Sequence, residues 1–86
     1  YGFNAMPVIL RYTGFRFFFF SNEGEPLEPA HIHVRKGECV AKFWINPAVT
    51  LDEAYGFHSS ELREIGDVVL ENRDLIERCW HERFGD

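Results

Sequence analysis

An 86-residue chain is long enough for one small domain and too short for two. Its residues are 45% hydrophobic and 16% aromatic, which is typical of a folded globular domain and argues against intrinsic disorder. The net charge of −5 is uneven: residues 1–50 hold five basic and four acidic side chains, and residues 51–86 hold four basic and ten acidic ones. We therefore expect any contact with nucleic acid in the first half and not in the acidic second half.

The ends of the chain and its cysteines bear on where the protein works. Residues 1–5 precede Met6 and look like the remnant of an expression tag, so we expect a single domain over residues 6–86. The sequence has no apolar run of 18 residues and no signal-peptide pattern. Cys39 and Cys79 lie 40 residues apart without a metal-binding spacing, which favours reduced thiols. These features predict a cytoplasmic protein that does not interact with membranes.

Alternating apolar and polar residues in the first half predict β-strands. The predicted strands cover residues 8–12, 15–20, 31–36 and 39–45. Residues 21–29 contain asparagine, glycine and two prolines, a composition typical of a loop. The turn at Gly37-Glu38 is short enough to join the last two strands as a hairpin.

The strand over residues 15–20 is apolar on both faces. Its two faces consist of Phe15, Phe17 and Phe19, and of Arg16, Phe18 and Phe20. A strand of this kind needs cover on both sides. Because one helix covers only one side, we expect Phe18 and Phe20, or the edge of the sheet, to take part in self-association or to meet a partner protein.

The hairpin over residues 31–45 separates an apolar face from a polar one. By parity, the inner face holds Ile32, Val34, Ala41, Phe43 and Ile45. The outer face gathers the candidate site residues His31, His33, Arg35, Lys42, Trp44 and Asn46. An ordinary surface strand seldom carries two histidines and an arginine on one side, so this face is the predicted functional centre.

The second half changes to helical periodicity. Residues 50–55 are expected to form a short helical turn that ends at Gly56. Ser59 and Ser60 mark the start of a helix whose apolar positions continue at helical spacing to about Arg83, a length of roughly 35 Å. The change of period predicts an α+β fold, with a small antiparallel sheet of three to four strands and one long C-terminal helix packed on one face.

Several motifs resemble, in this order, the bacterial domain-of-unknown-function family 4160. They are RFFFFSNE at residues 16–23, PAHIHV at 29–34, AKFWINP at 41–47, GF at 56–57, SELREI at 60–65 and WHE at 80–82. The resemblance covers essentially all of residues 6–85, although Ala30 stands where the family usually repeats the proline. It implies a small cytoplasmic protein of bacteria or archaea. It also implies the toxin half of a toxin–antitoxin pair, encoded beside a small cognate antitoxin. The family name brings no established catalytic residue.

One hypothesis is a metal-independent ribonuclease without a cofactor. A histidine exchanges protons near neutral pH, so His31 and His33 would act as base and acid on a ribose 2′-hydroxyl and a leaving oxygen. Arg35 would complete the catalytic group and neutralise the phosphate. The substrate-binding residues would be Lys42, Trp44 and Asn46, with the tryptophan as a stacking surface for a base.

Two other hypotheses stay open. In the first, His31 and His33 bind a metal, because with Glu38 five residues further on they match part of the cupin pattern. Glu38 falls in the predicted turn, so further ligands would have to come from Glu28, Cys39 or His58. In the second, the histidines hydrogen-bond the loop around Pro29 or the turn at Asn46, and the outer face is a non-catalytic surface for protein–protein interaction. The partner would then be the cognate antitoxin or a second copy in a homodimer.

Overall fold

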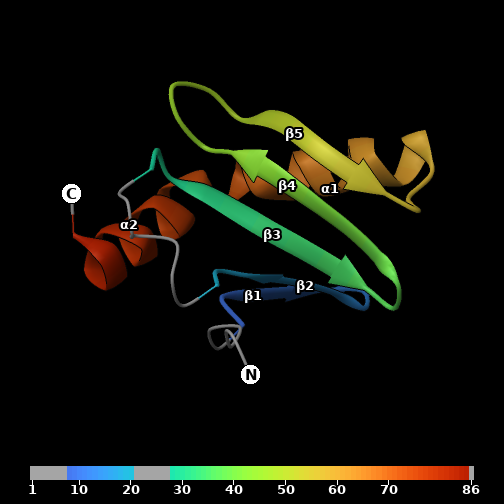
Figure 1. The fold of residues 1–86 in the computed structure, drawn as a ribbon, viewed down its shortest axis with the longest axis horizontal. Coiled ribbons are helices and arrows are strands. Elements are labelled where there is room, and N and C mark those ends of the chain that lie inside the picture. The colour runs from blue at the N-terminus through green and yellow to red at the C-terminus, as the bar shows by residue number, and fades with distance from the viewer. Residues whose placement is uncertain (1–7, 21–27, 86) are drawn as a thin grey trace.

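The computed structural model describes residues 8–20 and 28–85. The expected tag remnant and most of the expected loop over residues 21–29 lie outside these ranges. The described residues form five strands and two helices: β1 (Leu10–Tyr12), β2 (Phe15–Phe18), β3 (His31–Lys36), β4 (Cys39–Trp44), β5 (Thr50–Tyr55), α1 (Ser59–Glu71) and α2 (Arg73–Phe84). The strands form one antiparallel sheet in chain order, β1-β2-β3-β4-β5. In Figure 1, α1 crosses behind β4 and β5, and α2 lies at the end of the sheet where β3 begins.

The prediction of three to four strands and one long helix is wrong on both counts. The additional strand is β5, whose residues 50–55 were expected to form a helical turn. This segment pairs antiparallel with β4, from Thr50 opposite Trp44 to Tyr55 opposite Val40, with a bulge between Lys42 and Phe43. Its local sequence has no strong preference of its own, so pairing with an already formed strand decides its conformation.

The expected single helix is divided at Asn72. This residue has φ −108° and ψ 18°, outside the helical range, and it ends α1 and precedes α2. Its side-chain Nδ2 donates a hydrogen bond of 2.8 Å to the carbonyl oxygen of Val68. Asparagine competes in this way with the backbone hydrogen bonds of a helix. The segment therefore forms two helices, of 13 and 12 residues, in place of the single long helix that was predicted.

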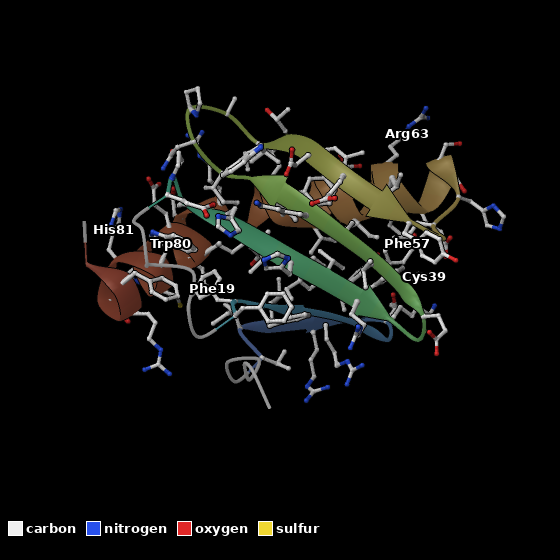
Figure 2. The ribbon with its side chains drawn as sticks, viewed as in Figure 1. Phe19, Cys39, Phe57, Arg63, Trp80 and His81 are labelled. Carbon is white, nitrogen blue, oxygen red and sulfur yellow. The ribbon has the colours of Figure 1, made fainter. Side chains whose placement is uncertain are left out.

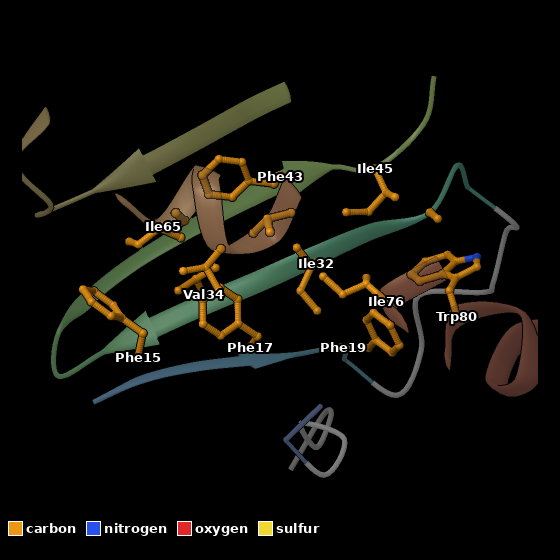
Figure 3. Packing of buried hydrophobic residues seen from close by; sticks show 14 residues of the cluster. Phe15, Phe17, Phe19, Ile32, Val34, Phe43, Ile45, Ile65, Ile76 and Trp80 are labelled. Carbon is orange, nitrogen blue, oxygen red and sulfur yellow. The ribbon is translucent and has the colours of Figure 1, made fainter. Parts of the chain in front are cut away.

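The core lies between the sheet and the two helices, as Figure 3 shows. The inner face predicted by parity is confirmed: Ile32, Val34, Ala41, Phe43 and Ile45 are all buried there. Phe15, Phe17 and Phe19 extend this layer from the neighbouring strand and the residue that follows it. The helices contribute the other layer with Ile65, Val68, Val69, Ile76 and Trp80. Because the helices cover this face, the opposite face of the sheet is the one on which a site can form.

Candidate functional site

The open face is the side of the sheet opposite the helices. The pairing of β3 with β4 places His31 opposite Trp44 and His33 opposite Lys42 on this side. Arg35 follows on the same face two residues later. These predicted site residues therefore share one face of the sheet, although their surroundings differ.

Asn46 differs from the other predicted site residues, because it follows β4 and connects the sheet to α2. Its Nδ2 donates a hydrogen bond of 2.7 Å to Glu77 Oε2. Arg73 Nη2 donates hydrogen bonds to Asn46 Oδ1 at 3.1 Å and to the carbonyl oxygen of Pro47 at 3.0 Å. These bonds use both ends of the Asn46 amide, so its role here is to hold the end of β4 against α2.

His31 is buried, with 1% of its surface exposed. Its Nδ1 lies 3.0 Å from the carbonyl oxygen of Pro29. Its ring centroid lies 4.8 Å from Trp80 and 5.3 Å from Trp44. Figure 2 shows Trp80 beside Phe19, at the end of the sheet that α2 covers. The arrangement matches the structural interpretation of His31, since a ring this covered has no surface for contact with a substrate.

His33 is half-buried within a group of rings that we call the aromatic cluster, Phe18, Phe20 and His33. Its ring stacks on Phe18 with centroids 5.9 Å apart and an interplanar angle of 28°. The ring of Phe20 meets it edge-on at 4.6 Å. The aromatic cluster covers the second apolar face of β2. Phe18 is only 8% exposed because the rings of Phe20 and His33 pack beside it on the same face.

Lys42 is already occupied by neighbouring side chains. Its Nζ lies 3.7 Å from Asp52 Oδ2 and 3.9 Å from Glu28 Oε1. The same ammonium group sits 4.3 Å from the ring centroid of Trp44, in a cation–π contact. Lys42 is thus placed to balance carboxylates of the protein, and it covers the ring of Trp44 that was expected to stack on a base.

A row of three arginines crosses the open face and was not found from the sequence. Arg11 on β1 pairs in register with Arg16 on β2, and Arg16 pairs with Arg35 on β3. All three are exposed, and within residues 8–20 and 28–85 no acidic side chain forms an ion pair with them. Like charges directly opposite one another destabilise a sheet. We call this set the arginine row; it spans about 10 Å at the usual strand spacing.

A cleft of about 340 Å³ lies on the open face beside the arginine row. The aromatic cluster lines one side, Arg35 and Val40 line the middle, and Glu53 and Tyr55 of β5 line the other side. The ring of Tyr55 is 71% exposed. Sequence analysis missed this cleft because its far wall belongs to the strand that was expected to be helical.

The metal hypothesis gains no ligand set from the described part of the chain. No group of three histidine, cysteine or acidic side chains comes together there in an arrangement that could hold a metal ion. Glu28 Oε1 lies 3.9 Å from His31 Nδ1. His58, by contrast, precedes α1 as its N-cap, and Cys39 begins β4 opposite Lys36.

Comparison with known proteins identifies the family. The family model described as "Domain of unknown function (DUF4160)" matches residues 14–81. The chain belongs to this family. The DUF4160 match includes the aromatic cluster, the cleft, Arg16 and Arg35, whereas Arg11 precedes it. No curated protein and no solved structure matched. Neither helix of the described DUF4160 chain is long and apolar enough to cross a membrane.

Proposed function

We propose that this protein binds single-stranded RNA on its open face, as the toxin-like member of a bacterial toxin–antitoxin pair. The observation that carries the proposal is the arginine row beside the aromatic cluster. Guanidinium groups bind phosphates and fix the register of the strand, and rings provide stacking surfaces for unpaired bases. The cost of placing three like charges side by side is offset when an anionic ligand lies across them.

The distribution of charge supports the choice of this face. Helices α1 and α2 carry seven acidic and four basic side chains, so the opposite side of the molecule repels a polyanion. The arginine row lies on the side that the helices leave open. The overall charge of −5 is therefore compatible with RNA binding, because the excess of acid is on another surface.

The open-face residues then take different roles. Arg11 and Arg16 bind the phosphates, since both are exposed and lie outside the cleft. Phe20 and His33 offer partly exposed rings to a base. Cleavage by the His31–His33 pair is not part of the proposal, because His31 is 1% exposed and its Nδ1 faces the carbonyl oxygen of Pro29. Of the two histidines, His33 is the one placed to exchange a proton with bound RNA.

Fluorescence anisotropy with a labelled 10-nucleotide single-stranded RNA of mixed sequence tests the binding. The double variant Arg11→Gln/Arg16→Gln should weaken binding at least tenfold, because it removes two phosphate contacts. The matched control is Arg63→Gln/Arg78→Gln, which removes the same charge from exposed positions on the helices. Arg63 is labelled in Figure 2. We expect the control to bind within twofold of wild type, and equal weakening of both variants would contradict the proposal.

Inducible expression in a bacterial host tests the toxin-like role. We expect the wild type to arrest growth, the Arg11→Gln/Arg16→Gln variant to be tolerated, and coexpression of the neighbouring small gene to restore growth. The proposal places the protein in the cytoplasm, where it meets RNA and its antitoxin. Harmless expression of the wild type would remove the toxin-like role, and the titration would still decide whether the open face binds RNA.

A further inference from the structure

We propose that the cleft of the open face binds a single unpaired guanine base. This inference rests on the proposed RNA binding and names the part of the RNA that the cleft selects. The cleft encloses about 340 Å³, which lies in the lower part of the range for small-molecule sites. Most of its lining is aromatic or apolar, and its charged side chains are Arg35, Lys42 and Glu53, of which Arg35 and Glu53 form no ion pair within the described residues.

Arg35 and Glu53 line the same cleft without contacting each other. Arg35 lies across β4 from Tyr55, and Glu53 lies across β4 from His33. The two residues are therefore diagonal to each other, and their backbones lie about 12 Å apart at the usual strand spacing and rise. No ion pair joins them, and within the described ranges no other side chain forms an ion pair with either of them. The cleft thus has the hydrogen-bond donors of Arg35 in its middle and the acceptors of Glu53 on its β5 side, placed diagonally, with space between them for a flat ligand.

Lys42 would be the natural partner of Glu53, because the two residues pair in register on neighbouring strands. Its ammonium group instead lies 3.7 Å from Asp52 and rests on the ring of Trp44. Lys42 also lines the cleft, but its ammonium group is held by Asp52, Glu28 and the ring of Trp44 and forms no ion pair with Glu53. The carboxylate of Glu53 is left to accept hydrogen bonds from a ligand, as an ionised carboxylate accepts only.

Guanine is the base whose edges match the donors of Arg35 and the acceptors of Glu53. It carries the acceptors O6 and N7 on one edge, and arginine binds this pair through two parallel hydrogen bonds. Its ring N–H and its 2-amino group lie on another edge and donate to a carboxylate. Adenine presents an amino donor where guanine presents O6, so it would meet the donors of Arg35 with a donor of its own. The charges thus select guanine over adenine.

Stacking completes the site. The ring of Tyr55 is 71% exposed, and those of Phe20 and His33 are partly exposed. A base in the cleft covers apolar ring surface that water now reaches, which favours binding. Val40 lies between these rings and provides an apolar floor. These parts of the site come from β3, β4 and β5, except for Phe20, which follows β2.

Calorimetric titration of the full chain with nucleoside monophosphates tests the inference. We expect guanosine 5′-monophosphate to bind at least tenfold more tightly than the adenosine, cytidine or uridine compound. Inosine 5′-monophosphate lacks the 2-amino group, so its affinity should lie between those of the guanosine and the adenosine compound. Equal affinity for all the nucleotides, or no measurable binding of the guanosine compound, would overturn the inference.

Glu53→Gln tests the acceptors of Glu53 directly. It should remove most of the preference for guanosine over adenosine, because the amide loses the charge and brings a donor to the same position. The matched control is Glu82→Gln, an exposed carboxylate on α2, which should keep the preference of wild type. Failure here is distinct from failure of the proposed function: RNA binding through the arginine row without base preference would overturn only the guanine site.

Discussion

The arginine row predicts how RNA binding depends on salt. A protein that neutralises phosphates of a single strand releases counterions, and the logarithm of the binding constant falls with the logarithm of salt with a slope of about −0.7 for each phosphate. Arg11 and Arg16 lie outside the cleft, so we assign them one phosphate each. The wild-type slope should then be about −1.4, and the affinity should fall about sevenfold between 50 and 200 mM salt.

Arg16→Gln is the sharpest single change, because Arg16 pairs in register with both of the other arginines. It removes one phosphate contact, so the slope of the variant should be about −0.7. The affinity of the variant should then decrease about threefold between 50 and 200 mM salt. The substitution also removes the repulsion of Arg16 with Arg11 and with Arg35, so the free energy of unfolding should not decrease.

Anisotropy titrations at four salt concentrations measure the slope, and urea denaturation checks the fold of each variant. Arg63→Gln on α1 serves as the control for the loss of one exposed charge. We expect its slope to equal that of the wild type. An Arg16→Gln slope indistinguishable from the wild-type slope would refute the assignment of Arg16 to a phosphate, whatever happens to the affinity.

Two further predictions concern stability. Gly66 lies inside α1, and a Cβ added there would meet the nearest core ring at 3.5 Å, an ordinary contact. Gly66→Ala should therefore raise the free energy of unfolding in urea by about 0.5–1 kcal/mol through its better helix propensity, and a destabilised variant would contradict this. The second prediction concerns Tyr12, whose hydroxyl donates a 2.8 Å hydrogen bond to Glu64 on α1, and this bond raises the tyrosine pKa above its usual 10.0. Because the folded-state pKa is the higher one, this contribution is present below pH 10 and is lost as the pH rises. The wild type should lose stability relative to Tyr12→Phe as the pH rises above 10, and equal pH dependence of the two free energies of unfolding would contradict this.

The periodicity of apolar residues in the sequence was enough to predict part of the fold. The alternation over residues 31–45 identified the hairpin and divided it into an apolar and a polar face, as the pairing of Ile32 with Phe43 and of His33 with Lys42 confirms. This works because successive side chains of a strand point to opposite faces, whatever the rest of the chain does. The apolar positions of the second half likewise indicated helical structure from residue 59 to about residue 83, although they predicted one helix where the structure has two.

Other elements depended on contacts that the local pattern does not contain. Residues 50–55 became a strand because β4 offered an unpaired edge, and the helical pattern ended at Asn72 because its side chain bonds the backbone. The arginine row needs two pairings between three strands, which no periodicity in one segment reveals.

His31 and His33 show most clearly what the sequence determined by itself and what only the tertiary structure decided. Their spacing placed both rings on one face, and the structure keeps them there, with ring centroids 5.3 Å apart. Burial separates them, because Trp80, 49 positions further along the chain, packs over His31 and leaves His33 beside the cleft. Strand periodicity is a local property of the backbone, whereas access to solvent depends on which distant side chain covers a residue, and that is settled only when the chain packs.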